Sequence, residues 1–209
     1  MIRVLLADDH AVVRAGLREI LSDTGDIVVA GEAANGQEVL FQVRQQDFDV
    51  AVLDMSMPGR SGIELIKQVK SEKPKLRVLI LSMHSEQQYA VRALKAGASG
   101  YLTKDSAADQ LVAAIRRIAG GGAYVTPETA ERLALDAAPR SDAAPHTRLS
   151  DREFQVFQLI AAGRTVTEIA QQLSLSVKTV STHKTRIMEK MNLANPSELI
   201  RYAIDNKLI

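Results

Sequence analysis

The chain of 209 residues contains no cysteine. Disulfide bonds, thiolate metal sites and cysteine nucleophiles are therefore excluded, and the composition fits a reducing cytoplasm. Long apolar runs are also missing. The longest runs are short, such as residues 78–81, whereas a membrane helix needs roughly 18 apolar residues. No cleavage-site pattern follows the first residues, so we expect no signal peptide. We expect a cytoplasmic protein without a membrane span.

An excess of charge of one sign is absent too. The formal net charge is +1 at pH 7, so the overall charge does not indicate a nucleic-acid partner, and any such indication must be local. The sequence has the composition of a folded, soluble protein, with 46% hydrophobic and 24% charged residues. Its length suits two domains of ordinary size.

Residues 1–120 alternate short apolar runs with segments of helical periodicity. The expected strands are residues 2–7, 27–31, 50–53, 78–81 and 100–102, and the expected helices are residues 11–23, 36–46, 61–72, 87–96 and 107–119. Several of the strands are nearly continuous in Val, Ile and Leu, as in sheets covered on both faces. Five strands alternating with five helices predict an α/β fold with a doubly wound, five-stranded parallel sheet. Ligands of such sheets bind beyond the carboxyl ends of the strands.

Residues 121–148 are predicted to link this domain to a second one. A short helix is expected from Thr126 through Leu135, and residues 136–148, rich in Ala and Pro, are interpreted as a flexible tether. From Leu149 onward only helical patterns follow. Three expected helix starts place a capping residue three positions before a glutamate, in the pairs Ser150 and Glu153, Thr165 and Glu168, and Asn195 and Glu198. Residues 149–209 are therefore predicted to form an all-α domain of four helices.

Charged side chains are predicted to meet at one edge of the sheet. Asp8 and Asp9 end the first strand and Asp54 ends the third, so three carboxylates converge at the carboxyl edge. Their mutual repulsion calls for a cation, and oxygen ligands without cysteine favour Mg²⁺. Ser82 and Lys104 follow the fourth and fifth strands and add a hydroxyl and an ammonium. Such a set is typical of a site that positions a phosphoryl group and neutralises its charge.

Residues 1–120 resemble the receiver domain of two-component response regulators, which has a flavodoxin-like (CheY-like) fold. The resemblance is carried first by the five residues at the sheet edge, which we call the acidic pocket: Asp8, Asp9, Asp54, Ser82 and Lys104. It is also carried by Met57-Pro58-Gly59 with Gly62, and by Tyr101. Asp8-Asp9-His10, Arg14 and Gly16-Leu17 are similar to the subfamily with a LuxR/NarL-type output domain. His10 also suggests a metal ligand or a base, but we interpret it as a residue at a helix start.

The receiver resemblance implies a role for each residue of the pocket. Asp54 is expected to accept a phosphoryl group from a sensor histidine kinase. The Mg²⁺ ligands are expected to be Asp9, Asp54 and the backbone carbonyl of Ser56, with support from Asp8. Ser82 and Lys104 are expected to bind the phosphoryl oxygens, and Tyr101 to change rotamer on activation.

Residues 168–180 have the pattern of a helix, a tight turn and a second helix, and the second is expected from Ser176 through Lys190. Its predicted core stripe is Val177, Val180, Ile187 and Met191. Its other face carries polar and basic residues, namely Lys178, Ser181, Thr182, Lys184, Thr185 and Arg186. Such a helix suits the major groove of DNA, although charge alone fits a solvated amphipathic helix as well.

The whole second domain resembles the LuxR/NarL (FixJ) helix-turn-helix. The matching segments are Leu149-Ser150-Asp151-Arg152-Glu153, Ala162-Gly163, Glu168-Ile169-Ala170, residues 178–183 and Lys190-Met191. The resemblance implies that Ser181, Thr182 and Thr185 face base edges. Phosphate contacts are expected from Lys178, Thr179 and Lys184, although Lys184 departs from the valine often found there. The family also binds DNA as a homodimer, so we expect phosphorylation to promote dimerisation and sequence-specific DNA binding that regulates transcription.

Two other functions remain open from the sequence. A Mg²⁺-dependent aspartate phosphotransferase or phosphatase of the haloacid-dehalogenase kind would share the α/β fold, but its nucleophile would stand in an Asp-x-Asp motif on the first strand. This chain has adjacent Asp8 and Asp9 and no cap insertion, so we expect no enzyme. Alternatively, the helical domain binds a protein instead of DNA.

Overall fold

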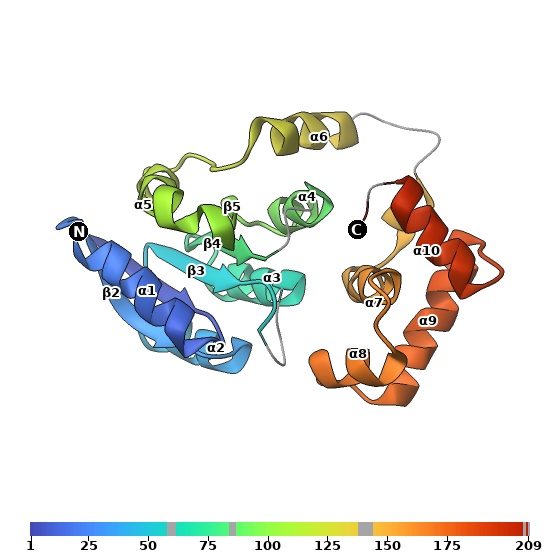
Figure 1. The fold of residues 1–209 in the computed structure, drawn as a ribbon. Helices are drawn as coiled ribbons and strands as arrows, with labels where there is room; N and C mark the ends of the chain where they lie inside the picture. Colours follow the sequence, from blue (N-terminus) through green and yellow to red (C-terminus); the bar gives the residue numbers. More distant parts are fainter. Residues whose placement is uncertain (58–61, 84–86, 138–143, 207, 209) are drawn as a thin grey trace. The chain divides into compact units, whose positions relative to one another are not determined.

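The computed structural model describes residues 1–57, 62–83, 87–137, 144–206 and 208. The chain divides into two compact units, Met1–Leu135 and Asp136–Ile209 (Figure 1). None of the described helices is long and apolar enough to cross a membrane.

The first unit contains the predicted parallel sheet. Its strands are β1 (Ile2–Ala7), β2 (Ile27–Ala33), β3 (Val50–Asp54), β4 (Arg77–Ser82) and β5 (Gly100–Thr103), and their order is β2-β1-β3-β4-β5. All four pairings are parallel. The strand order reverses between β1 and β3, and in a doubly wound sheet this switch point is where a site is expected. The predicted fold class is confirmed.

Helices cover both faces of this sheet. They are α1 (Ala11–Ser22), α2 (Gly36–Gln45), α3 (Gly62–Glu72), α4 (Gln87–Lys95) and α5 (Lys104–Ala119), followed by α6 (Pro127–Ala137) (Figure 1). Helix α5 begins three residues before the predicted start. Lys104, Asp105 and Ser106 show no apolar periodicity, so the sequence pattern did not include this first turn.

Alternate residues of the strands enter two separate cores. On β1, Leu5 and Ala7 pack with α2, α3 and α4, whereas Val4 and Leu6 pack with α1 and α5. Successive side chains of a strand point to opposite faces of the sheet. Because both faces are covered by helices, every one of these four residues is apolar, which explains why the strand patterns were continuous rather than alternating.

The segment after α5 adds a short parallel bridge to the sheet. Tyr124 pairs with Gly100 at the edge of β5. The amide of Tyr101 donates to the carbonyl of Tyr124, and the amide of Tyr124 donates to the carbonyl of Ser99, both at 3.0 Å. The start of the predicted linker is therefore bound to the backbone of Tyr101, the residue expected to switch.

Gly100→Ala is expected to disrupt this bridge. An added Cβ would lie 2.9 Å from the carbonyl oxygen of Tyr124 and 3.0 Å from Cδ1 of Leu79. We expect a destabilisation of about 1–3 kcal/mol and faster amide exchange at Tyr124, measured by urea unfolding and hydrogen exchange. Gly16→Ala is the matched control, since nothing lies within 4 Å of its added Cβ. Unchanged protection of Tyr124 in Gly100→Ala would contradict the prediction.

All regular secondary structure described within residues 144–206 is helical. It contains a short 3-10 helix, η1 (Pro145–Arg148), then α7 (Asp151–Ala161), α8 (Val166–Gln172), α9 (Val177–Met191) and α10 (Pro196–Asp205) (Figure 1). Two of the predicted capping boxes are complete, at the start of α7 and at the start of α8. The side chain of Asn195 caps α10. The predicted four-helix domain is confirmed, with η1 added before it.

The flexible tether predicted for residues 136–148 is shorter in the structure, because helices occupy both of its ends. Helix α6 continues to Ala137, and η1 occupies Pro145–Arg148. His146 is 3% exposed, and its Nδ1 lies 2.7 Å from the hydroxyl of Tyr202 on α10. Residues 138–143 of the predicted tether lie outside the described residues. The His146 contact involves a partner 56 positions away, so the local composition of the tether did not reveal it.

The predicted core stripe of α9 was wrong at Val177, which is 50% exposed, whereas Val180, Ile187 and Met191 are buried. At 100° per residue, spacings of 7 and 11 residues return to within about 20° of one face, but a spacing of 3 residues misses it by about 60°. Val177 is therefore rotated away from the core.

Candidate functional site

Two buried carboxylates and one lysine form the centre of the acidic pocket. Asp8 follows β1 and Asp54 ends β3, the two strands at the switch point, and each side chain is only 1% exposed. Nζ of Lys104, at the start of α5, lies 2.6 Å from Oδ2 of Asp8 and 3.1 Å from Oδ2 of Asp54. The structure thus brings together three of the residues predicted from three separate segments.

The buried charges of this centre do not balance, because two carboxylates face one ammonium. Burial raises the pKa of Asp54 above its usual value, and the Asp8 carboxylate adds to this, while Lys104 opposes it. Burial alone would lower the pKa of Lys104, but the carboxylates of Asp8 and Asp54 outweigh it and raise that pKa. Two buried carboxylates thus share one ammonium, so a further cation would be stabilised here.

The residues present fit a divalent cation. Asp9 is partly exposed, with 30% of its side chain accessible, at the rim of the pocket. Within the described residues, one ligand atom each of Asp8, Asp9, His10 and Asp54 lies within 4.8 Å of the others. The amide of Ser56 donates to Oδ1 of Asp54 at 3.2 Å, which places the backbone of Ser56 beside the same carboxylate. Oxygen donors of this kind suit Mg²⁺.

Of the two remaining predicted residues, Ser82 lies at the same edge of the sheet, whereas Tyr101 lies two residues before the end of β5, opposite Ile80. Ser82 ends β4 and is fully buried. Tyr101, on β5, is 7% exposed and belongs to the core beneath α2, α3 and α4. The tyrosine ring is therefore in its inward position, from which a rotamer change would move it to the surface.

The loop after Asp54 is only partly described, because Pro58 and Gly59 lie outside the described residues. Gly62, where α3 begins, has a φ of +60°, and an added Cβ would lie 3.1 Å from the sulfur of Met55. Both the left-handed backbone and the close sulfur require glycine at this position, which gives a physical reason for one residue of the receiver pattern.

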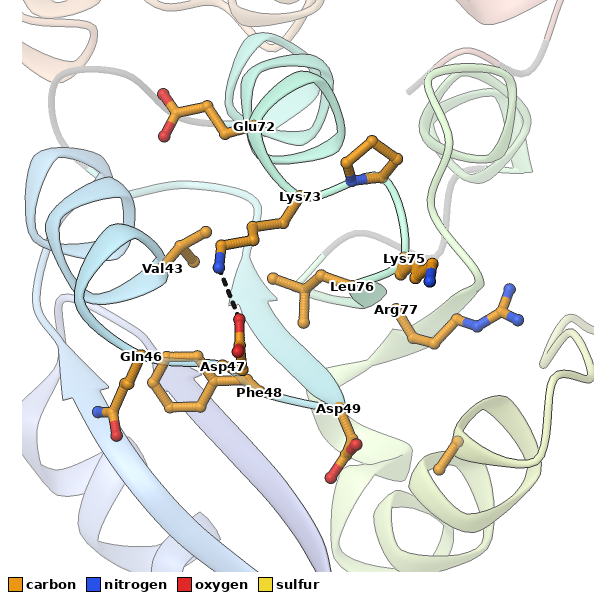
Figure 2. A pocket seen from close by; sticks show the side chains of 12 residues that line it. Val43, Gln46, Asp47, Phe48, Asp49, Glu72, Lys73, Lys75, Leu76 and Arg77 are labelled. Carbon is orange, nitrogen blue, oxygen red and sulfur yellow. Dashed lines mark hydrogen bonds and ion pairs between the residues drawn. The ribbon is translucent and has the colours of Figure 1, made fainter.

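A second hollow lies at the opposite edge of the sheet. It has a volume of about 530 Å³ and lies between the loops that precede β3 and β4. Figure 2 shows the side chains that line it. Phe48 and Leu76 contribute apolar surface, and Nζ of Lys73 lies 2.6 Å from Oδ1 of Asp47. Equal numbers of acidic and basic side chains line it. Because it lies at the amino ends of the strands, it is not where a doubly wound sheet places its chemistry.

The second unit presents a polar face on α9. Five of the predicted DNA-binding residues are exposed there, namely Lys178, Ser181, Thr182, Thr185 and Arg186. Thr179 is half-buried because its amide and hydroxyl contact the capping Ser176. Lys184 is half-buried as well, since it follows Val180 by four positions and lies on the inward side.

A shallow hollow of about 330 Å³ lies beside the first turns of α9, and its lining contains both cations and hydroxyls. The residues that line it are Ser176, Lys178, Thr179, Thr182, His183 and Arg186. Cations and hydroxyls of this kind are donors that contact phosphate oxygens in DNA-binding proteins.

Sequence reasoning did not identify the residues that hold α9 in place. Glu153 of α7 is 3% exposed, and its Oε2 accepts from Nζ of Lys190 at 2.6 Å and from the amide of Ser150 at 2.8 Å. Arg152 donates to the carbonyl of Leu173, which precedes α9. The capping-box pattern had indicated the bond between Glu153 and Ser150, but no local pattern pointed to Lys190, which is 37 positions away.

These two units define the class of the protein, which consists of a receiver domain and a helix-turn-helix domain. Residues 4–116 match the response regulator receiver domain, and residues 147–203 match the bacterial regulatory proteins of the luxR family. The chain belongs to the LuxR/NarL-type response regulators, transcription regulators with a LuxR-type DNA-binding domain.

Similar proteins match the chain over nearly its whole length. It is 38% identical to the response regulator UvrY of Escherichia coli K12, with 100% of this chain and 96% of that protein covered. It is also 38% identical to the oxygen regulatory protein NreC of Staphylococcus carnosus, with 99% of each covered. Among solved structures, the response regulator RcsB of Salmonella typhimurium is 31% identical, with a TM-score of 0.71 and 96% of each chain covered. The RcsB chain in an RcsB–DNA complex is 32% identical to this chain, with a TM-score of 0.60 and 96% of each chain covered.

Proposed function

We propose that Asp54 is the phosphoacceptor of this regulator and that a sensor histidine kinase is the donor. The observation that carries the proposal is the position of Asp54: a buried carboxylate at the carboxyl end of β3, 3.1 Å from Nζ of Lys104. A carboxylate oxygen attacks the phosphorus of a phosphohistidine, the P–N bond breaks, and the imidazole leaves and takes up a proton from solvent. The product is an acyl phosphate on Asp54.

Each neighbour of Asp54 has a separate task in this proposal. Lys104 holds one oxygen of the acyl phosphate, and the hydroxyl of Ser82 binds another. Asp9, Asp54 and the carbonyl of Ser56 hold Mg²⁺, supported by Asp8. When bound, the cation supplies charge neutralisation at the phosphoryl oxygens.

Phosphorylation is proposed to act on the surface of α4 and β5. The modification adds roughly −1.5 to −2 charges and three acceptor oxygens. Ser82 moves toward the phosphoryl group, and Tyr101 changes rotamer in response. Because Tyr101 is hydrogen-bonded through its amide to Tyr124, the change also reaches the segment that leads out of the receiver.

The polar face of α9 is proposed to enter the major groove. The hydroxyl of Thr182 donates to the carbonyl of Lys178 at 2.9 Å, and that of Thr185 donates to the carbonyl of Ser181 at 3.2 Å. Each threonine oxygen is therefore left as an acceptor, which matches the amino donors of adenine and cytosine. The hollow beside the first turns of α9 is the proposed phosphate contact, with Lys178, Thr179 and Arg186 as donors; Lys184 is a further, more inward candidate.

A homodimer on DNA completes the proposal. Two RcsB dimers have been seen on two parallel DNAs, and RcsB has been seen on a promoter in the presence of the phosphomimetic BeF₃⁻. Since this chain is 32% and 30% identical to those chains, we propose that its phosphorylated form also binds DNA as a dimer. Its place of action is then the cytoplasm, where bacterial DNA lies.

Lys178→Ala is expected to weaken DNA binding without changing sequence preference. Because Lys178 is exposed on the proposed phosphate-binding side, affinity should fall by similar factors for specific and unrelated duplexes. The slope of log affinity against log salt should become shallower by about one. Fluorescence anisotropy with labelled duplexes at several salt concentrations measures both quantities.

Two variants make this test specific. Lys75→Ala removes an exposed lysine from the receiver and should leave the slope unchanged. Lys184→Ala should have a smaller effect than Lys178→Ala because Lys184 is half-buried on the inward side. A loss at one base position only would make Lys178 a specificity residue, and an undiminished affinity would favour a protein-binding output domain.

The phosphatase alternative has less support. A dehalogenase-type nucleophile belongs to the first strand, whereas the buried, lysine-paired Asp54 ends β3. We therefore propose no catalytic turnover of a separate substrate. Repeated hydrolysis of a small phosphoester in excess over the protein would contradict this part of the proposal.

A further inference from the structure

His10 lies against the acidic pocket, and the proposed function leaves its imidazole without a role. Nδ1 of His10 is 2.9 Å from Oδ1 of Asp9 and 3.3 Å from Oδ1 of Asp8. The amide of His10 donates to the same Oδ1 of Asp8 at 2.8 Å. His10 precedes α1 as its capping residue but makes no side-chain capping bond. The predicted position at a helix start is confirmed, yet the ring is engaged with both acids.

The spacing of these atoms matches the ligands of one cation. Adjacent ligands of an octahedral ion at about 2.1 Å from the metal lie roughly 3 Å apart, and the two separations from Nδ1 are close to that value. Lys104 occupies Oδ2 of Asp8 and Oδ2 of Asp54. The remaining oxygen of Asp8 faces His10. The carboxylate of Asp8 is thus divided between the ammonium of Lys104 and the imidazole of His10, whereas Oδ1 of Asp54 accepts from the amide of Ser56.

We propose that Nδ1 of His10 is an additional metal ligand, which raises the affinity of this pocket for divalent first-row transition ions relative to Mg²⁺. The inference rests on the metal site of the proposed function. Magnesium prefers oxygen ligands, whereas an imidazole nitrogen raises affinity for ions such as Co²⁺, Ni²⁺ and Fe²⁺. The backbone of His10 is already held by Asp8, and its side chain is 66% exposed. Only side-chain torsions are therefore needed to point the nitrogen at an ion between Asp8 and Asp9.

The test compares Co²⁺ with Mg²⁺ in the full-length protein. Calorimetric titration gives both affinities, and the NMR spectrum of the Co²⁺-loaded protein shows paramagnetically shifted imidazole signals. The variants are His10→Gln, which removes the ligand, and Asp9→Asn, which removes a ligand of either ion. Asp23→Asn, an exposed aspartate at the end of α1, is the matched control.

His10→Gln is expected to lower the affinity for Co²⁺ by about tenfold or more, to abolish one set of shifted imidazole signals, and to change the Mg²⁺ affinity far less. Equal losses for both ions, or no loss for either, would overturn the role of His10 as a ligand. Tighter binding of both ions would also overturn it, because the ring would then occupy the place of the cation. If the wild type bound neither ion, or if Asp9→Asn bound both unchanged, the metal site of the proposed function would be wrong instead.

Discussion

Asp54→Asn is expected to abolish the response of DNA affinity to a small-molecule phosphodonor. In the wild type, we expect the donor to form an acyl phosphate on Asp54 and to tighten binding to a target duplex. An amide at this position has no nucleophilic carboxylate, so no phosphoryl group is incorporated and the affinities with and without donor become equal. Intact-protein mass spectrometry measures incorporation, and fluorescence anisotropy measures binding.

The loss in Asp54→Asn would not come from unfolding. Folding raises the pKa of Asp54, so the folded state favours the protonated carboxyl. The stability that this group contributes is present at low pH and is lost as pH rises through the raised pKa. Above the usual aspartate pKa, Asp54 therefore costs stability in the metal-free protein, and asparagine removes that cost. We expect thermal unfolding no lower than in the wild type.

Asp109→Asn is the matched control for this experiment, because Asp109 is exposed on α5 and the chemical change is the same. It should retain incorporation and the full response. Incorporation of one phosphoryl group into Asp54→Asn, with the DNA response preserved, would show that another residue is the acceptor.

The second large effect is expected for Glu153→Ala, which should destabilise the helix-turn-helix domain by about 2–3 kcal/mol. Loss of the capping box contributes about 1 kcal/mol, and loss of hydrogen bonds to a buried charged group contributes about 1.5–3 kcal/mol. The two contributions overlap, since both use the same carboxylate. The ion pair with Lys190 contributes little to this sum, because the Lys190 side chain is 42% exposed and solvent screens its charge.

Glu153→Ala is also expected to weaken DNA binding. Glu153 joins the start of α7 to the end of α9 through Lys190, so α9 should exchange its amide hydrogens faster and bind duplex DNA more weakly. Urea unfolding and hydrogen exchange of the full-length protein, resolved by residue, measure these changes. Glu168→Ala is the matched control: it breaks the equivalent capping box of α8, but its side chain is 49% exposed. Equal destabilisation by both variants would contradict a special role for the buried carboxylate.

Glu153 also predicts the acid sensitivity of this domain. Burial would raise the pKa of Glu153, but the hydrogen bonds from Lys190 and Ser150 outweigh it and lower the pKa below the usual glutamate value of 4.5. The stability from this group is therefore present above that value and is lost as pH falls through the lowered pKa. Glu153→Ala should flatten this part of the stability profile.

Much of the receiver pocket was predictable because strand direction fixes where strand ends meet. Once the five strands were recognised as parallel, Asp8, Asp54 and Ser82 had to lie at one edge of the sheet. The capping residues of α7, α8 and α10 were predictable for a similar reason, since a capping bond spans only three residues. In both cases, the information lies within a short segment or in the order of segments.

Other features depend on contacts between distant parts of the chain. Val177 and Lys184 lie about 60° and 40° from Val180 around α9, at one edge of the buried stripe, and the packing of α9 against α7 and α8 decides how much of each side chain is covered. The contact of His146 with Tyr202 joins residues 56 positions apart, so a segment with the composition of a tether became part of the domain.

The sequence by itself determined the two domains, the parallel sheet and the set of side chains at its carboxyl edge, because periodicity and strand order are local or sequential properties. Only the tertiary structure decided how the charges in that pocket are paired, with Lys104 on one side of Asp8 and His10 on the other. It also decided that Glu153 holds Lys190 and that Tyr124 joins the edge of β5. These arrangements depend on distances of a few ångströms between side chains whose directions are set by packing across the whole domain.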